Sequence, residues 1–541
     1  MHAVEIIITK RDGHELSDEQ IKWIIDAYTR GIVPDEQIAS LLMAIVWRGM
    51  TGRELATWTQ AMIDSGQRID LSSVSRPLVD KHSTGGVGDK ISLPLCPLVA
   101  ACGGAVPQLS GRGLGITGGT LDKMESIAGW NMMLSNEDNF DQLRFALKAT
   151  RSAYTQDKKN QTAWQYFIRH YDDIVSVCAA QGINSLAASY GPALIDRALI
   201  DAVCHFSGQS FYEVMKKNAI GIDLHQHPKL QDLSAYNLER FLAELKPSQK
   251  ISARHTVGLI DPLLETDLTA DSPSDGLPVC LKDIARHYGH THYKLKLSGN
   301  TEFDVDRLEK IASVIGHKAQ AISLDGNEQY QSGEAFQWFF KKFKSLPQLQ
   351  SICQKTLFVE QPIHRDQTLS SDVSAIAQSI PLLVDESDNE LDTFLSAAKL
   401  GYTGISSKSC KGVYKSIVNA ARCRQMTEST GRRYFQSGED LTMQAGVAVQ
   451  QDLALVNLLG LTHVERNGHH YVNGMAALSH EEQQAFQKEF PSLYETSDEV
   501  VRLRIQHGQI DLSSLNCQGF ATGRQRSPIE WDKMPTEKFS Y

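Results

Sequence analysis

From residue 251 to about residue 470, the chain alternates short apolar segments with helical patterns. The strand candidates are ISARHTVGLID, HYKLKLSG, QAISLDGN, KTLFVEQP, IPLLVDES and TGISSKS, at 251–261, 292–299, 320–327, 355–362, 380–387 and 403–409. Helical patterns such as 333–345 and 412–429 lie between them or follow them. Repeated strand–helix units predict a parallel α/β sheet, and this many units predict a closed (β/α) barrel.

Ionisable residues end these strands at regular intervals. Lys294 and Lys296 alternate on one strand, so both are expected on the same side of it. The next four strands end at Asp325, Glu360, Asp385 and Lys408. The carboxyl ends of barrel strands meet at one mouth, and three adjacent carboxylates repel one another unless a cation joins them. Oxygen ligands alone favour a hard cation, so we expect Mg²⁺. A single Asp at a strand end is usually only the cap of the next helix. Ionisable residues at the ends of five successive strands favour a shared site instead.

These motifs resemble the enolase superfamily. The resemblance lies in the KLK strand, LDGN, VEQP, VDES and SSKSCKG, and in the helical pattern YGPALIDRALIDAV at 190–203. A lysine on each side of the acidic set resembles the muconate-lactonizing branch. The resemblance covers about residues 140–520 and implies a (β/α) barrel of enolase type. It also implies Mg²⁺-dependent removal of the proton α to a carboxylate.

The resemblance gives the residues expected roles. Mg²⁺ on Asp325, Glu360 and Asp385 would hold the substrate carboxylate and offset the charge that develops as the α-proton leaves. Lys296 is expected to be the base, because a neighbouring ammonium and a dication lower the pKa of an amine.

Three more residues complete this expected site. Lys294 would stay charged and hold the substrate carboxylate. Lys408 would face the other side of the substrate, as proton donor, second base or stabilising cation. Asn327 would orient a ligand from behind.

For the other polar residues, a purely structural role competes with a role in the site. Lys411 is expected to open the next helix rather than to join the site. His287, His290 and His292 favour a solvated loop cluster over a transition-metal site. Two further groups fit the mouth or a loop network equally well: Glu439 and Asp440, and Glu465, Arg466, His469 and His470.

The N-terminal part lacks the strand–helix repeats and has helical patterns followed by glycine-rich segments. Helices are expected at 18–30, 35–48 and 52–65, the first with Ser17 and Gln20 as a capping box. The stretch KHSTGGVGDK at 81–90 follows, with the glycines, hydroxyls and lysines of a phosphate cradle. It does not fit the P-loop frame.

The stretch from 80 to 130 closely resembles the thymidine and pyrimidine-nucleoside phosphorylase family, and the match covers about residues 1–135. The resemblance implies phosphate contacts at Lys81, Ser83, Ser92, Ser110 and Thr120, with His82 beside the base and sugar. The segment at 157–173 departs from that family, because it lacks the arginine and the Ser–Lys pair that grip the pyrimidine.

The sequence therefore predicts a fusion: a phosphorylase-like segment at 1–135, a helical capping segment at 136–250, a barrel at 251–475 and a tail at 476–541 that returns to the cap. After residue 480 the tail reads as irregular and polar. The first hypothesis is a Mg²⁺-dependent lyase or isomerase acting on a small carboxylate. The alternatives are a pyrimidine-nucleoside phosphorylase that binds phosphate or nucleoside at its N-terminal segment, or that segment as a dimerisation module only.

Net charge and composition indicate which classes of binding partner and which cellular compartment to expect. The net charge of −10 disfavours nucleic acid and anionic membranes as partners. The nine cysteines form no Cys-x-x-Cys pair, which favours reduced thiols in a cytoplasmic protein. We expect no signal peptide and no membrane span, because no apolar run approaches the ~18–20 residues that a span requires. A homo-oligomer is expected.

Overall fold

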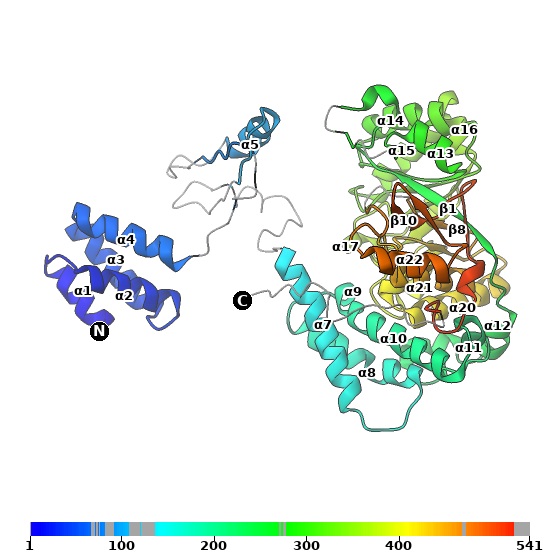
Figure 1. Cartoon of the computed structure of the whole chain (residues 1–541), viewed down its shortest axis with the longest axis horizontal. Helices are drawn as coiled ribbons and strands as arrows, with labels where there is room; N and C mark the ends of the chain where they lie inside the picture. Colours follow the sequence, from blue (N-terminus) through cyan, green and yellow to red (C-terminus); the bar gives the residue numbers. More distant parts are fainter. Residues whose placement is uncertain are drawn as a thin grey trace. The chain divides into compact units, whose positions relative to one another are not determined.

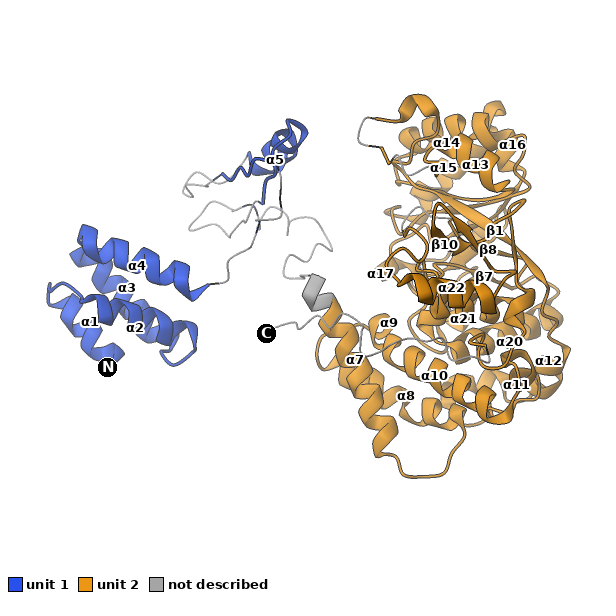
Figure 2. Cartoon of the chain, in the orientation of Figure 1, with its two compact units in different colours: residues 1–133 blue, residues 134–541 orange. Residues whose placement is uncertain are grey.

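The computed structural model describes residues 2–66, 71, 74, 76–81, 91–107, 120, 136–269, 272–273, 277–467 and 472–523. The chain divides into two compact units, residues 1–133 and 134–541, coloured separately in Figure 2. Each unit is described by itself below. Among the described helices, none combines the length and hydrophobicity that a membrane crossing requires.

The first unit opens with four helices: α1 (Ala3–Arg11), α2 (Asp18–Thr29), α3 (Asp35–Arg48) and α4 (Gly52–Ser65). Helix α1 packs on α3 and α2 packs on α4. The predicted capping box of Ser17 and Gln20 is present at the start of α2. Helix α1 escaped prediction, because the three consecutive isoleucines of AVEIIITKR give no helical period.

A buried ion pair ties the ends of this helical bundle together. The ammonium of Lys10 lies 2.8 Å from a carboxylate oxygen of Glu54, and both side chains are buried. Glu54 also accepts hydrogen bonds from the backbone N–H groups of Leu16 and Thr51, each at 2.8 Å. Further along, α5 (Ser92–Ala101) lies between the two residues of a parallel bridge, Leu78 and Ala105.

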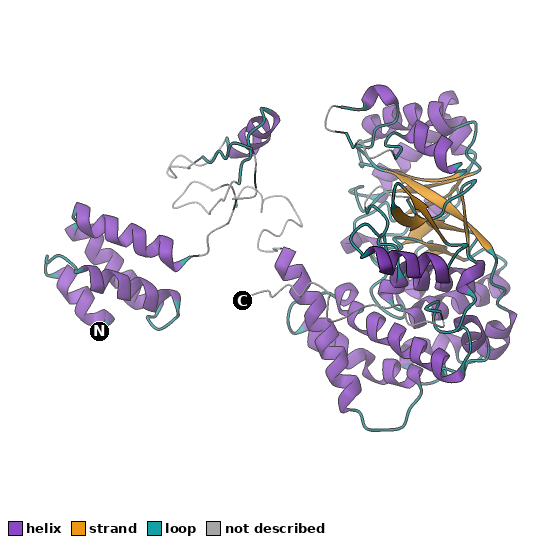
Figure 3. Cartoon of the chain, in the orientation of Figure 1, coloured by secondary structure: helices purple, strands orange, loops and turns teal. Residues whose placement is uncertain are grey.

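The second unit contains a closed barrel of eight parallel strands, which confirms the predicted architecture (Figure 3). The strands are β1 (Lys250–Val257), β2 (His292–Lys296), β3 (Ala321–Asp325), β4 (Thr356–Glu360), β5 (Leu382–Val384), β6 (Gly404–Ser407), β7 (Phe435–Gly438) and β8 (His463–Glu465). Each pairs with the next, and β8 closes the barrel on β1. The sequence did not single out β8, because this strand has three residues and two of them are ionisable.

Helices surround the barrel. They are α13 (Leu281–Tyr288), α14 (Thr301–Ile315), α15 (Gly333–Ser345), α16 (Gln350–Cys353), α17 (Arg365–Thr368), α18 (Ser374–Ala377), α19 (Thr393–Lys399), α20 (Val413–Thr430) and α21 (Val447–Leu458). Helix α15 matches its predicted range, because its phenylalanines recur at helical spacing and all face the core.

A helical layer precedes the barrel and packs beside α20 and α21 (Figure 1). Its helices are α7 (Asn136–Gln156), α8 (Ala163–Ala179), α9 (Ser185–Ala188), α10 (Tyr190–Ser207), α11 (Phe211–Lys216) and α12 (Leu238–Glu244). The ring of Tyr414 on α20 packs against Trp164 and Phe167 of α8, with centroids 5.3 and 5.1 Å away. Arg197 of α10 donates a hydrogen bond to Gln451 of α21 at 2.8 Å.

Residues 480–523 form regular structure, so the expectation of an irregular polar tail is wrong for this part. It contains α22 (His480–Glu489), β9 (Tyr494–Ser497), β10 (Val500–Leu503) and β11 (Gln509–Asp511). Strand β11 pairs antiparallel with β1, and the ring of Phe520 stacks on Phe211 at 3.9 Å. The polar composition hid an alternation in which Val501, Leu503 and Ile505 are buried.

Candidate active site

The predicted residues of the strand ends meet around one ammonium group. Lys294, on β2, has its Nζ 2.9 Å from oxygens of Asp325, Glu360 and Glu465, and 3.1 Å from Glu439. Only 1% of the Lys294 residue is exposed. Burial opposes the charged form, but the four carboxylates outweigh it and raise the pKa of Lys294 well above its ordinary value. Lys294 is therefore a permanent cation at the centre of the mouth.

Lys296 lies two residues further along β2 and is less buried. Its Nζ is 2.6 Å from Asp325 Oδ2 and 2.5 Å from Asn327 Oδ1. Burial and the neighbouring Lys294 lower the pKa of Lys296, but Asp325 outweighs them and the pKa is raised. This direction is the opposite of the expected one. The cause is that the carboxylate of Asp325 is turned toward the amine.

Lys408 stands across the mouth from Lys296, because β2 and β6 flank the three strands that carry Asp325, Glu360 and Asp385. Its Nζ lies 2.6 Å from Asp385 Oδ2 and 2.5 Å from Asp440 Oδ2. The two lysines therefore border the same row of carboxylates from opposite ends.

Lys411 also belongs to this cluster, which corrects the expectation of a charged residue opening a helix. Its buried ammonium lies 2.9 Å from Asp385 Oδ1 and 2.9 Å from Ser406 Oγ. The short 3-10 turn Ser409–Lys411 after β6 brings this side chain to Asp385, the residue that follows β5.

Polar side chains beside the predicted ligands fix the carboxylates: Asn327, which was expected, and Gln361 and Glu386, which were not. Gln361 accepts hydrogen bonds from the backbone N–H groups of Asp385 and Ser387, at 2.9 and 3.1 Å. Asn327 donates its own N–H to Asp325 Oδ1 at 2.9 Å and its side-chain amide to Glu386 at 3.1 Å. Burial, with Asp385 and Asp325 nearby, raises the pKa of Glu386 to about 7. Gln361 and Glu386 could have been predicted from the sequence, because each directly follows a predicted metal ligand.

The last two strands add acids that the sequence left undecided. Glu439 follows β7 and Glu465 ends β8, and both contact Lys294 in the mouth. Arg254, inside β1, forms a buried ion pair with Glu439 and donates to Ser437 Oγ at 3.0 Å. A buried arginine within an apolar strand was a signal that sequence reasoning missed. Arg466 instead donates to the carbonyl of Thr442 at 2.6 Å, which is a loop network. His469 and His470 lie outside the described residues.

The donor set can be tested for Mg²⁺. Among the described residues, no three His, Cys, Asp or Glu side chains are arranged to hold a metal, because lysines contact the oxygens instead. Seven carboxyl groups and five cations of the described residues nevertheless share the mouth, and burial raises the pKa of Glu360 well above its ordinary value and that of Glu386 to about 7. The acids are Asp325, Glu360, Asp385, Glu386, Glu439, Asp440 and Glu465, and the cations are Arg254, Lys294, Lys296, Lys408 and Lys411. Buried Glu360 Oε2 lies 2.9 Å from Lys294 Nζ but makes no hydrogen bond within the described residues. This oxygen-only set is of the type that a hard dication prefers.

The expected solvated histidine cluster is wrong. His290 is buried, with Nδ1 3.1 Å from the carbonyl oxygen of Ala253, and its ring centroid lies 5.1 Å from that of His255. His292 lies on β2 and His287 on α13. The three are separated because the strand begins within the motif and takes His292 into the barrel.

Only some of the predicted phosphate-cradle residues lie within the part of the chain that the structure describes. Ser92 is the first residue of α5 and is buried, as is Thr120. Lys81 donates its backbone N–H to Asp80 Oδ1 at 2.8 Å. His82, Ser83 and Ser110 lie outside the described residues, so the cradle remains a prediction from sequence.

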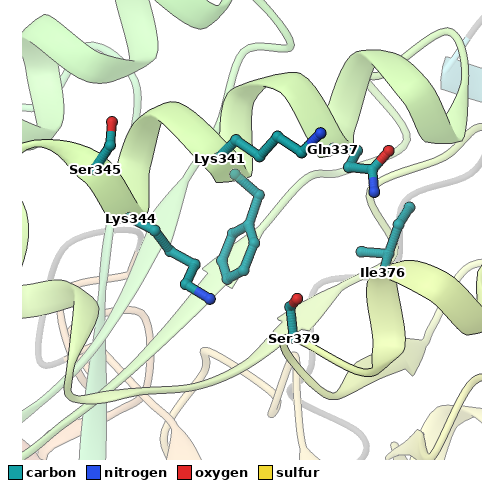
Figure 4. A pocket seen from close by; sticks show the side chains of 7 residues that line it. Gln337, Lys341, Lys344, Ser345, Ile376 and Ser379 are labelled. Carbon is teal, nitrogen blue, oxygen red and sulfur yellow. The ribbon is translucent and has the colours of Figure 1, made fainter.

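The described residues form several cavities away from the mouth, among them the following two. One, of about 300 Å³, opens between α15 and the turn after α18 (Figure 4). Its lysines, Lys341 and Lys344, stand on the last turns of α15, where they complement the negative end of the helix dipole. The other, of about 330 Å³, opens at the amino ends of β4, β7 and β8.

The N-terminal quarter has known relatives. Residues 4–66 match the helical bundle domain of a glycosyl transferase family, and residues 75–167 match its a/b domain. A thymidine phosphorylase of Mycobacterium tuberculosis is 63% identical over 141 residues, which are 26% of this chain and 33% of that protein. A pyrimidine-nucleoside phosphorylase of Geobacillus stearothermophilus is 52% identical over 141 residues, with the same coverage of 26% and 33%.

This quarter is phosphorylase-like. The chain spans about a third of the length of these curated relatives. Their activity therefore does not transfer to the chain as a whole.

The solved structures that resemble the chain include enolase-superfamily proteins. A superfamily member of unknown function from Enterococcus faecalis V583 is 13% identical, with a TM-score of 0.43, over 73% of this chain and 81% of that chain. A mandelate racemase/muconate lactonizing enzyme from Bordetella bronchiseptica RB50 is 14% identical, with a TM-score of 0.44, over 71% and 85% of the two chains. Likeness at this level carries no functional conclusion for this chain.

Proposed function

We propose that the barrel removes the proton α to a carboxylate of a small substrate, with Mg²⁺, and so isomerises, epimerises or β-eliminates it. The observation that carries this proposal is the pair of lysines, Lys296 and Lys408, at opposite ends of one row of buried carboxylates. A base and an acid on opposite faces of a bound carboxylate are what such proton transfers need.

Asp325, Glu360 and Asp385 would hold Mg²⁺, because they end three adjacent strands and share the mouth. When bound, the ion supplies Lewis acidity that offsets the negative charge gained by the substrate as its proton leaves. Lys294 remains an ammonium and contributes a second positive charge.

Lys296 is proposed to take the α-proton on Nζ. The amine must be neutral to do so, which requires Asp325 to be engaged elsewhere than in its present 2.6 Å contact. Asn327 would then remain as the hydrogen-bond acceptor that keeps the amine directed at the mouth, at 2.5 Å. Lys408 would return a proton to the opposite face in an epimerisation, or act as a stabilising cation in the other outcomes.

We propose that the helical segment at 136–250 caps this mouth and that the C-terminal segment at 476–541 returns to that cap, as the stacking of Phe520 on Phe211 supports. Helix α10 packs on the turn that carries Lys411, and Arg197 lies 3.6 Å from Asp452, which accepts a hydrogen bond from Ser409 in that turn. If Arg197→Ala lowered stability but left the catalytic constants unchanged, this segment would be a structural layer only.

The proposed function is tested by a proton-exchange screen in D₂O over acid sugars, dipeptides and aromatic carboxylates. Deuterium at the α-carbon of one class, dependent on Mg²⁺, supports it. Absence of exchange in all classes at saturating Mg²⁺ counts against it.

A second candidate is pyrimidine-nucleoside phosphorolysis by the N-terminal unit. The observation in its favour is the long phosphorylase-like match, which includes Lys81, Ser92 and Thr120. Phosphate-dependent release of thymine from thymidine would support it. Loss of dimers on deletion of residues 1–135, with barrel activity kept, would instead assign this unit to dimerisation.

A further inference from the structure

The cavity at the amino ends of the barrel strands lies at the opposite end from the carboxylate mouth. It is lined by the starts of β4, β7 and β8 and has a volume of about 330 Å³. That volume is within the range of small-molecule sites, about 300–1,000 Å³. This cavity takes no part in the proposed site at the mouth.

One wall of the cavity is aromatic. The rings of Phe358 and Phe435 line it, with centroids 5.4 Å apart, and Leu461 adds an aliphatic surface. Gly404 makes room for this pair, because a Cβ there would lie 2.6 Å from the ring of Phe435. The two ring planes are inclined by 46°, so the wall offers an angled aromatic surface against which an apolar ring can pack.

The same cavity carries a cation without a partner carboxylate. Arg433 lines it, with its guanidinium 5.6 Å from the centroid of Phe435. Within the described part of the chain, no Asp or Glu forms an ion pair with Arg433. Arg432 and Arg433 are both exposed, but Arg432 donates to the carbonyl of Gly401 at 3.1 Å, whereas Arg433 lines the cavity.

His463 supplies a second donor. Its Nδ1 lies 2.9 Å from Nη1 of Arg254, and an arginine can only donate, so Nδ1 accepts. Burial and the charge of Arg254 lower the pKa of His463 to about 2, so the ring is neutral and carries its proton on Nε2. In the described residues this N–H has no acceptor, and the ring lines the cavity.

We propose that this cavity binds an aromatic carboxylate, whose ring packs against Phe358, Phe435 and Leu461 and whose carboxylate accepts hydrogen bonds from Arg433 and His463. The guanidinium gives directional, charge-assisted bonds to a carboxylate, and the aromatic wall favours a planar ligand over an aliphatic one. The proposal does not depend on the reaction at the mouth.

The test measures binding of 2-naphthoate to the full-length chain by isothermal titration calorimetry, with 2-naphthamide as the uncharged match. We expect Arg433→Gln to weaken naphthoate about tenfold, the loss of one charge-assisted contact, and to leave naphthamide unchanged. Arg432→Gln is the matched control and should change affinity less than twofold. Leu461→Trp, which fills the cavity, should abolish binding of both compounds.

Three results would overturn the proposal. They are no naphthoate binding by the unmodified protein at millimolar concentration, equal affinities for the Arg433→Gln and unmodified proteins, or loss of binding in Lys408→Met with retention in Arg433→Gln. The last would place the compound at the mouth. Thermal unfolding of each variant checks that it is folded.

Discussion

The ammonium of Lys411 lies 2.9 Å from Asp385 Oδ1 and 2.5 Å from the carbonyl oxygen of the same residue. Lys408 takes the other carboxylate oxygen at 2.6 Å, and Lys415 continues the series with a contact of 3.0 Å to Asp388. Buried acids and bases thus alternate from the mouth toward the helical layer. A buried charge with a partner on each side has one low-energy position, so this chain of ion pairs fixes Asp385.

Lys411→Met is expected to destabilise the barrel by about 3 kcal/mol, because it leaves a buried carboxylate short of a cation. Urea unfolding followed by circular dichroism measures the effect. Lys310→Met is the control, since Lys310 forms an exposed pair with Asp306 and such pairs contribute less than about 1 kcal/mol. Equal effects of the two substitutions would mean that Lys411 is not a member of the buried chain.

Mg²⁺ is expected to raise the unfolding temperature of the protein, because it binds the folded state alone. At a concentration of 100 Kd, binding raises the free energy of unfolding by about 2.7 kcal/mol. Asp385→Asn and Glu360→Gln should abolish this shift. Glu334→Gln, an exposed substitution at the start of α15, should keep it. A shift of the same size in all three variants would place the ion elsewhere.

Sequence patterns predicted the barrel because each strand–helix unit carries its own local signal. The alternating Lys294 and Lys296 and the strand-end Asp385 could be placed at one mouth from topology alone. Short β8 and buried Lys411 could not, because their positions depend on barrel closure and on a turn that brings Lys411 to Asp385. The same limit explains His290, whose burial is set by contact with β1.

Glu54 predicts an acid-sensitive N-terminal unit. Burial opposes its charge, but hydrogen bonds from Lys10 and two backbone N–H groups outweigh this and lower the pKa of Glu54 from 4.5 to about 2. A folded-state pKa below the unfolded one gives stability that is present above pH 4.5 and is lost as pH falls toward 2. The loss should reach about 3 kcal/mol.

Hydrogen exchange of residues 3–65 measures this loss between pH 5 and pH 2.5. In Glu54→Gln the pH dependence should shrink, whereas exposed Glu15→Gln should leave it intact. Undiminished pH dependence in Glu54→Gln would assign the effect to other carboxyl groups.

Gly404→Ala is expected to destabilise the barrel by about 1–3 kcal/mol, because the added Cβ would lie 2.6 Å from the ring of Phe435. Gly52→Ala provides the matched comparison, since nothing lies within 4 Å of its added Cβ. That change should be neutral or slightly stabilising. Chemical unfolding of both variants decides whether the packing of Phe435 across β6 is as tight as described.

The most direct test of the proposed chemistry is α-proton exchange by single lysine variants. With the substrate class found by the D₂O screen, the account predicts Mg²⁺-dependent deuterium uptake in the unmodified protein and at least a hundredfold slower uptake in Lys296→Ala, the low end expected for loss of a general base. Lys310→Ala should exchange normally. Exchange at the unmodified rate in Lys296→Ala would contradict the assignment of the base, and exchange indifferent to Mg²⁺ would contradict the proposed function.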